Sequence, residues 1–501
     1  MNAPGDLGRQ SLVLIGSTWT ASALGFLSTV LVARWLGPEA LGVLGFGFGL
    51  VGVLAAIVLP GFAQAHAKRV AEGRDLGRCV GTMVALQLVC QGAVLVLVLL
   101  ASPWWPLVIP EGVPGEVILF ILLAQVLGNL AGSFTVAFIG RQWALAHAGT
   151  LLVGKGLRFL ATVAVLLWAP DVRWVAAALL VESGAELAIG AWILRVRRGV
   201  ALRAPDRETL RSYWTYARPL LVTNPVGMLQ DSLDRVLVAW WAGLAAAGYY
   251  QVARALWELL GTLNAYPFQL LFARLSGLFG TRSLGQDAEA RRLFASAVDK
   301  LLFVAVPAAF GLWAFREVAI RLLYGAPLLP AAASLMVFVV AALCQSALNP
   351  YHFVLYALEV HARFVPVVLL RLAIYLAAMA VLVPLWGGPG AAGVRLLLVL
   401  FPAWVFIRWT RELASIGFQR VTWVYAAGFA TLAALNEGGR GLLALAGAAG
   451  PLALAGGLAI ALTGYGLVLW LLHPGLGDNL RYARDLAHPS RFVAFLRARP
   501  S

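Results

Sequence analysis

The chain has 501 residues, of which 61% are hydrophobic and 12% are charged, and its formal net charge is +15. Soluble domains carry roughly 45–50% apolar and about 25% charged residues, so this composition excludes a water-soluble globular fold. The basic residues stand in short loops between apolar blocks, where they orient spans and meet anionic lipid head groups. We therefore expect membrane lipids, and no nucleic acid, as partners of this positive charge.

Apolar blocks of about twenty residues recur along the chain, the length at which a helix crosses roughly 30 Å of hydrocarbon. They predict an all-α integral membrane protein with about 14 transmembrane helices. The first block is too long for a signal-peptide core and is expected to be retained as a span. The predicted spans are 12–33, 41–63, 80–101, 117–139, 145–168, 175–194, 219–242, 246–272, 299–323, 328–350, 364–385, 390–410, 421–438 and 448–472.

Lysine and arginine residues are distributed unequally between the two sides of these spans. Of the 38, 27 fall on one side and five on the other: Arg34, Arg173, Arg316, Arg321 and Arg440. Cytoplasmic loops are the ones that carry an excess of basic residues. The count predicts a multi-pass protein of the cell (inner, cytoplasmic) membrane with both termini in the cytoplasm.

An internal repeat relates the two halves of the chain. Residues 31–42 read LVARWLGPEALG and residues 237–248 read LVAWWAGLAAAG, with seven of twelve positions identical. Both copies stand where an outward-going helix turns back, so the repeat is parallel, as in transporters whose two similar halves enclose a cavity. We predict an N-lobe at 1–210, a C-lobe at 211–420, two further spans within 421–472, and a basic cytoplasmic tail at 473–501.

These segments resemble polysaccharide and O-antigen exporters of the multidrug/oligosaccharidyl-lipid/polysaccharide (MOP) superfamily. The resemblance lies in LVARWLGPEALGVLGF and IVLPGFAQAHAKRVAEG in the first half, and in DSLDRVLVAWWAGLAAAGYYQVARAL, PAAFGLWAFREVAIRLLYGAPLLPAA and YALEVHARFVPVVLLRLAIYLAAMAVLVPLWGGPGAAGV in the second. It implies a flippase that moves a polyprenyl-diphosphate-linked oligosaccharide from the cytoplasmic to the outer leaflet. It also implies the fourteen-helix, two-lobed fold, and it makes glycan-assembly enzymes candidate partners.

One departure from related flippases concerns the first two spans. Some relatives, including peptidoglycan-precursor flippases, carry several cationic residues there. Here these spans are uncharged between Ser11 and Lys68 except for Arg34 and Glu39 at their outer turn. The departure argues against a peptidoglycan-precursor role.

Six basic residues remain inside the predicted spans, where a charge costs at least ~2.5–3.5 kcal/mol and needs a partner or a watery cavity. A guanidinium offers forked donors to phosphate oxygens and an ammonium offers a point charge. A weaker sequence similarity between the two halves aligns Arg158 with Arg371, which would place cations on both lobes. The candidates to bind a substrate diphosphate are Arg158, Arg371, Arg254, Lys155 and Arg235. The alternative for Lys155 and Arg158 is snorkelling, or pairing with Glu182 of the sixth span.

Acidic residues accompany these cations in the seventh and eighth spans. Asp231, Asp234 and Arg235 share one helix face, and Arg254 and Glu258 are four residues apart. The five groups could form one buried cluster, which would either lock the two spans together or serve transport. Asp231 and Glu258 are candidates for exchanging a coupling proton, and Asp234 is a candidate ion-pair residue.

The sequence argues against an enzyme. The predicted outward loops are short, and the six histidines form no HExxH motif or paired metal spacing. We therefore expect no catalytic residues, no metal and no cofactor. The closest alternatives are a drug or metabolite exporter of the same superfamily and a peptidoglycan-precursor flippase. A drug exporter would have a less cationic cavity, so the charge that faces the cavity discriminates between the two classes.

Overall fold

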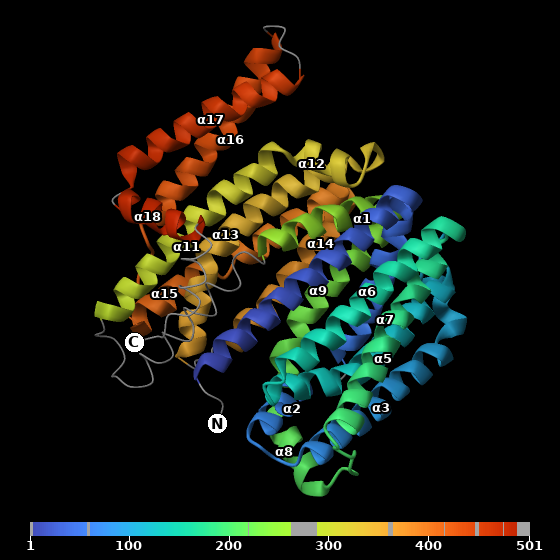
Figure 1. The fold of residues 1–501 in the computed structure, drawn as a ribbon. Helices are drawn as coiled ribbons and strands as arrows, with labels where there is room; N and C mark the ends of the chain where they lie inside the picture. Colours follow the sequence, from blue (N-terminus) through green and yellow to red (C-terminus); the bar gives the residue numbers. More distant parts are fainter. Residues whose placement is uncertain are drawn as a thin grey trace. The chain divides into compact units, whose positions relative to one another are not determined.

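The computed structural model describes residues 4–57, 61–218, 220–261, 288–358, 364–414, 416–445, 450–473 and 475–487. Within these ranges all regular elements are helical, and nine helices are long and apolar enough to cross a membrane. Two of the nine, Val13–Ala56 and Val365–Leu413, have 44 and 49 residues, about twice what one crossing requires. The prediction of an all-α, multi-pass membrane protein is confirmed (Figure 1).

The two longest helices contain sharp turns at glycines. α1 (Pro4–Ile57) holds the first two predicted spans and reverses at Gly37, whose φ is 79°. α14 (Phe364–Leu400) holds the eleventh span and part of the twelfth, and it reverses at Gly387, whose φ is 58°. Positive φ is accessible to glycine because it lacks a β-carbon, so each glycine permits the reversal between two spans.

Two predicted spans extend too far. The ninth, 299–323, was expected to be continuous, but α11 (Ala288–Ala314) ends early and a short helix α12 (Arg316–Leu323) follows. The twelfth, 390–410, is interrupted near Pro402, because α14 ends at Leu400 and α15 (Ala403–Ala414) begins after the proline. Proline disfavours helical backbone in the residue before it and cannot donate a helical hydrogen bond, which accounts for the second break.

The chain forms two compact units, of which unit 1 comprises Met1–Gln251, Leu323–Leu328 and Met379–Gly388. In it α1 packs against α6 and α9, and α5 packs against α7 (Figure 1). Its other helices after α1 are α2 (Phe62–Ala71), α3 (Leu76–Leu100), α4 (Trp105–Val108), α5 (Gly115–Gly140), α6 (Ala144–Trp168), α7 (Val172–Trp192), α8 (Arg207–Ala217) and α9 (Leu220–Ala242), followed by a helix at 244–261 whose first part belongs to this unit. The predicted lobe boundary at residue 210 stays a prediction.

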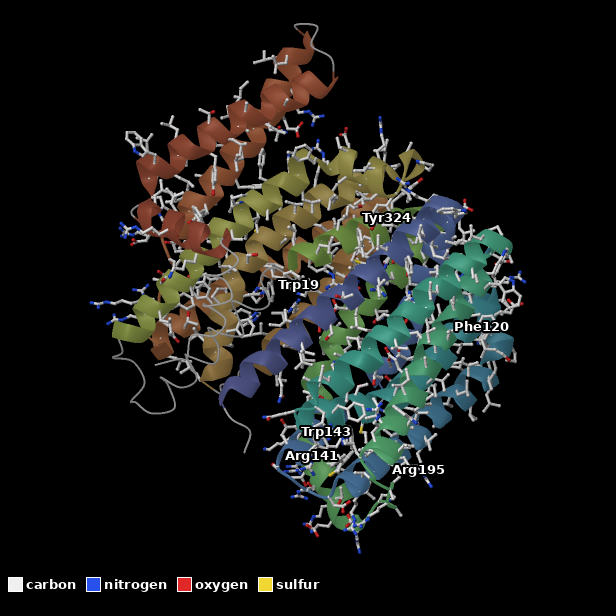
Figure 2. All side chains as sticks on the ribbon, viewed as in Figure 1. Trp19, Phe120, Arg141, Trp143, Arg195 and Tyr324 are labelled. Carbon is white, nitrogen blue, oxygen red and sulfur yellow. The ribbon has the colours of Figure 1, made fainter. Side chains whose placement is uncertain are left out.

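The end of unit 1 that carries α2 and α8 is rich in basic residues, including the labelled Arg141 and Arg195 (Figure 2). His66 of α2 is fully buried there and joins three helices. Its Nε2 lies 2.9 Å from the carbonyl oxygen of Ser133 on α5, and its Nδ1 lies 2.7 Å from the hydroxyl of Tyr213 on α8. A carbonyl only accepts, so the Nε2 atom carries the proton. The neutral imidazole thus fastens both amphipathic helices to the span bundle.

Unit 2 comprises Val252–Leu322, Leu329–Ala378 and Pro389–Ser501. In it α11 packs against α13 and α16, and α16 packs against α17. Its remaining helices are α13 (Ala331–Ala357), α16 (Val421–Leu445), α17 (Gly450–Leu472) and α18 (Leu476–Ala487). α16 continues past the predicted end of the thirteenth span, because Glu437 accepts a 2.8 Å hydrogen bond from Arg316 and its charge is thereby paired.

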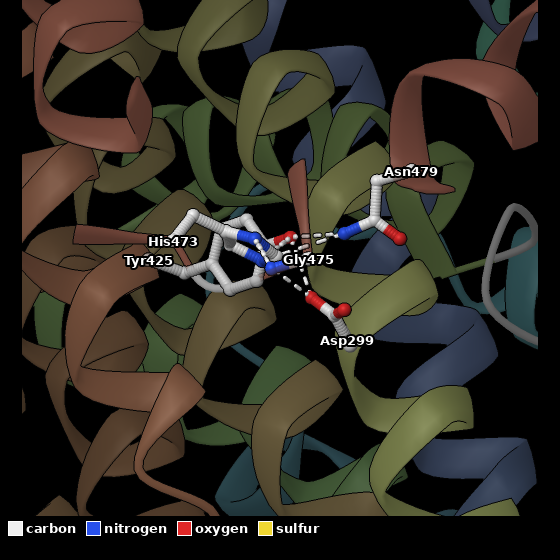
Figure 3. A network of polar contacts seen from close by, with 5 residues as sticks. All are labelled: Asp299, Tyr425, His473, Gly475 and Asn479. Carbon is white, nitrogen blue, oxygen red and sulfur yellow. Dashed lines mark hydrogen bonds and ion pairs between the residues drawn. The ribbon is translucent and has the colours of Figure 1, made fainter. Parts of the chain in front are cut away.

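A polar network fastens the last helices of unit 2 to α11 (Figure 3). The backbone N–H of Gly475 donates to His473 Nδ1, so Nε2 carries the proton and donates to Asp299 Oδ1 at 2.7 Å. The hydroxyl of Tyr425 donates to the same carboxylate oxygen at 2.8 Å, and Asn479 Nδ2 donates to that hydroxyl at 3.2 Å. The start of α16 and the end of α17 therefore share one carboxylate on α11, and α18 joins the network through the hydroxyl of Tyr425.

Candidate functional site

A cluster of charged residues lies between α6 and α7 in unit 1. Lys155 and Arg158 are three residues apart on α6, and both contact Glu182 on α7. The distances are 2.5 Å from Lys155 Nζ to Glu182 Oε1 and 3.1 Å from Arg158 Nη1 to Oε2. The Glu182 side chain is 11% exposed, and the two cations are 26% and 21% exposed. The ion-pairing alternative for these two residues is therefore confirmed.

Arg158 also borders a small, mostly apolar pocket of about 40 Å³, which has room for about three water-sized groups. Among the described residues that line it, Arg158 is the charged one, and the polar ones are Ser28, Thr29, Thr162 and Gln251. The Oε1 atom of Gln251 is buried and meets no hydrogen-bond donor in the part of the chain that the structure describes. The pocket thus combines a cationic donor, hydroxyl groups and an open acceptor, and its charge is positive.

The two copies of the sequence repeat form the same turn. Gly37 and Gly243 occupy equivalent positions, with φ values of 79° and 87°. Five positions further on, Gly42 packs on the carbonyl oxygen of Leu244, and Gly248 packs on the carbonyl oxygen of Pro38. A β-carbon at either glycine would overlap the facing carbonyl. The contact is reciprocal, because position 12 of each copy meets position 8 of the other.

Other turns gather at this predicted outer end of unit 1. Arg34 Nε donates to the carbonyl oxygen of Leu323 at 2.7 Å, and Trp240 Nε1 donates to that of Val108 at 2.7 Å. The turn at Gly387 approaches Ala242. Segments from both sequence halves therefore pack together here, which closes this end of the unit by backbone and side-chain contacts.

The remaining predicted site residues occupy different environments. Asp234 is fully buried and accepts a 2.8 Å hydrogen bond from the hydroxyl of Tyr250, whereas Asp231 is exposed. Arg254 is 7% exposed and donates to Glu258 at 2.8 Å, as the four-residue spacing predicts. Arg235 is half-buried on α9, where its Cβ lies against Gly49 of α1.

Three expectations about these groups stay predictions. One is the single cluster that would join Asp234 and Arg235 to Arg254. Another is the pairing of Arg371, half-buried on α14, with Arg158 around one substrate. The third is coupling through Asp231 and Glu258.

The sequence interpretation missed Glu186 and Gln251. Glu186 stands one turn beyond Glu182 on α7 and lies against Gly154 of α6, next to Lys155. A signal was present, because two carboxylates four residues apart follow a lysine and an arginine three residues apart on the preceding span. Glu182 was predicted from this pattern as a pairing partner, but Glu186 was not. Gln251 carried no such signal, since an uncharged amide in a span has no distinctive pattern.

A family model described as "Polysaccharide biosynthesis protein" matches residues 7–278, more than half of the chain. No curated protein matches the sequence at a significant level. The sequence match covers both copies of the repeat, the α6–α7 charge cluster and the residues that line the pocket.

Solved structures of MOP superfamily transporters are similar in fold. The lipid II flippase MurJ, in an inward closed conformation, matches with a TM-score of 0.69 at 11% identity, over 93% of this chain and 99% of that one. An inward-facing MATE-family multidrug resistance transporter matches with a TM-score of 0.62 at 14% identity, over 78% and 94%. A MOP transporter from Pyrococcus furiosus matches with a TM-score of 0.56 at 15% identity, over 82% and 95%. At these identities the matches establish the fold alone.

Proposed function

The chain belongs to the polysaccharide biosynthesis protein family, and on that premise we propose that it is a flippase for a polyprenyl-diphosphate-linked oligosaccharide. It carries this lipid from the cytoplasmic to the outer leaflet of the cell membrane by alternating access, without a covalent step. Both termini face the cytoplasm, and enzymes of glycan assembly supply the substrate. Its fold is that of MOP transporters, a superfamily in which one of the matched structures is itself a lipid flippase.

The observation that carries the proposal is the positive charge at the pocket in unit 1. Arg158 borders the pocket, and Lys155 stands one turn away on the same helix. A diphosphate is a dense anion that a guanidinium binds through two parallel donors and an ammonium binds as a point charge. The hydroxyls of Ser28, Thr29 and Thr162 beside Arg158 offer further polar contacts. This combination supports an anionic head group as the substrate.

The packed turns at the predicted outer end supply the gate. Gly42 and Gly248 lie directly on backbone carbonyls of the opposite repeat copy, so this end is closed in the present conformation. Loading from the cytoplasmic side leaves these contacts in place. Delivery to the outer leaflet requires them to separate, because both turns stand across the exit path.

The drug-exporter alternative is disfavoured by the same charge. An exporter of cationic drugs needs acidic groups at its binding pocket. The charged residue at this pocket, among those that the structure describes, is the basic Arg158. The peptidoglycan-precursor alternative is disfavoured by the uncharged stretch between Ser11 and Lys68, where the turn residues Arg34 and Glu39 are the exceptions.

Reconstitution tests the proposal. The purified full chain is placed in proteoliposomes with a fluorescent oligosaccharide on a short polyprenyl diphosphate, and reagent accessibility reports its movement between leaflets. The matched control carries the same oligosaccharide on a neutral polyprenyl ether, and a cationic dye serves as a drug-like probe. We expect faster movement of the diphosphate lipid than in empty liposomes and no effect on the other two. Transport of the dye without the lipid would replace this proposal by drug export.

A further inference from the structure

Glu182 is a single carboxylate shared by two cations. Its Oε1 contacts Lys155 and its Oε2 contacts Arg158, so each oxygen faces a different positive group. The three side chains are one-tenth to one-quarter exposed, inside helices that cross the membrane. Two positive charges face one carboxylate in these two contacts, and Glu186, one turn along α7 against Gly154, is a second carboxyl group nearby.

Cations in this position need an anion in every state of the transport cycle. A charge near the bilayer centre costs at least ~2.5–3.5 kcal/mol, and breaking a buried pair by removing one partner is strongly destabilising. When no substrate is present, Glu182 is the anion that both cations face. The pocket beside Arg158 has room for about three water-sized groups in this conformation, so it must widen on loading to admit a diphosphate. The diphosphate then supplies a second anion to the same donors, and a guanidinium binds phosphate through bidentate contacts.

We propose that Glu182 competes with the substrate diphosphate for Arg158 and Lys155. It is a positioning residue whose ion pairs with these two cations break when the substrate loads and form again when the substrate leaves. The inference rests on the proposed function and extends it. Without the Glu182 carboxylate the two cations would bind the diphosphate more tightly, because no other anion would take the place of the diphosphate when it leaves. Glu182 thus weakens binding and speeds release.

Glu186 provides the matched comparison. It lies one turn further along α7 against Gly154, so it shares the helix and the neighbourhood of Lys155. No ion pair joins it to either cation among the described side chains. Replacing it with glutamine removes a carboxyl group from the same helix and the same neighbourhood, but leaves both ion pairs in place.

The experiment measures binding of inorganic pyrophosphate to the purified full chain in nanodiscs. Four forms are compared: wild type, Glu182→Gln, Glu186→Gln and Glu182→Asp. We expect Glu182→Gln to bind about tenfold more tightly, equivalent to about 1.4 kcal/mol, and to show a lower KM and a lower kcat in lipid translocation. Glu186→Gln should change the affinity less, and Glu182→Asp should restore it towards wild type. A purely structural role for Glu182 would instead weaken binding in Glu182→Gln.

Equal or weaker binding by Glu182→Gln overturns the inference. Should that variant fail to fold, carbodiimide labelling of the wild type decides: pyrophosphate should increase labelling of Glu182, and unchanged labelling under saturating pyrophosphate overturns the inference. The triple variant Lys155→Met/Arg158→Met/Glu182→Gln tests the anion site separately, because it leaves no unpaired buried carboxylate. Loss of binding there with no change in Glu182→Gln rejects only the competition. No pyrophosphate binding by any form rejects the competition and the anion site together.

Discussion

The backbone of Gly248 packs directly on the carbonyl oxygen of Pro38, two residues separated by more than two hundred positions in the sequence. The equivalent glycine of the first repeat copy, Gly42, packs on Leu244 in the same way. Because both contacts involve main-chain atoms, neither can be relieved by a side-chain rotation. The two turns fit together only while positions 42 and 248 lack a β-carbon.

Replacing Gly248 with alanine should therefore destabilise this closed arrangement. The new β-carbon would overlap a carbonyl group, and forced overpacking of this kind costs roughly 1–3 kcal/mol. We expect a lower unfolding temperature, or a shift towards a conformation in which a cysteine placed at the buried Ala247 reacts faster with a water-soluble maleimide. Thermal unfolding and labelling rates measure both outcomes.

The control is Gly25→Ala on α1, where a β-carbon meets nothing within 4 Å. In a helix this change should be neutral or stabilising by up to about 1 kcal/mol. If Gly248→Ala behaved like Gly25→Ala in both measurements, the reciprocal packing would not be a gate.

Removing the hydroxyl of Tyr425 should weaken the attachment of the last helices. That hydroxyl donates to Asp299 and accepts from Asn479, so Tyr425→Phe leaves the partly buried Asp299 and the buried Asn479 each short of a partner and should cost about 1–3 kcal/mol. Tyr465→Phe is the matched control in the same core, because the Tyr465 hydroxyl is buried without a partner among the described residues. Its loss should be neutral or stabilising. Equal destabilisation by both variants, measured by denaturant or thermal unfolding in detergent, would contradict the network.

Acidification should destabilise unit 1 through His66. Burial lowers the pKa of His66 from 6.5 to about 4, and its hydrogen bond to the Ser133 carbonyl opposes the shift only in part. The folded state therefore binds the proton less well than the unfolded state. The stabilisation is complete above pH 6.5 and is lost as pH falls from 6.5 towards 4, approaching about 3 kcal/mol.

The measurement for His66 is the unfolding temperature between pH 8 and pH 4.5. The wild type should lose stability on acidification, and His66→Gln should lose less over the same interval even if it starts lower. Parallel curves for the two proteins would show that another group carries the pH dependence.

The span pattern of this protein was predictable because hydrocarbon thickness and loop charge act on every segment in the same way. The exceptions have local causes. α16 extends beyond its predicted end because Arg316 pairs with Glu437, a contact between residues 121 positions apart. The split between α14 and α15 follows a single proline, Pro402, which bends the chain inside an apolar run that hydropathy alone assigns to one span.

The candidate site was predictable only in its composition. Lys155 and Arg158 were predicted as site residues because they are charged groups in the middle of a span. Their pairing with Glu182 was predicted because it lies on the next span. Which of these groups borders a pocket depends on side-chain direction, and periodicity does not report it in helices that are apolar on all sides. Gln251 became recognisable only when its unpartnered oxygen was placed beside that pocket.

Neutralising the cations should abolish selective transport. Arg158→Ala combined with Lys155→Ala removes both groups proposed to bind the diphosphate, but it leaves Glu182 as an unpaired buried carboxylate. The variant to compare is therefore the triple variant, which also carries Glu182→Gln. Arg173→Ala is the control, because this arginine is half-exposed at the predicted outer end. The triple variant should fold and bind no pyrophosphate, whereas the control should match the wild type.

The most direct measurement is the initial rate at which the fluorescent polyprenyl-diphosphate oligosaccharide crosses the bilayer of proteoliposomes that contain equal amounts of folded wild-type, triple-variant or Arg173→Ala protein. A rate at least tenfold above empty liposomes for the wild type and the control, and a background rate for the triple variant, is the predicted result. Equal rates for the wild type and the triple variant would contradict the claim that this charge cluster carries the lipid diphosphate.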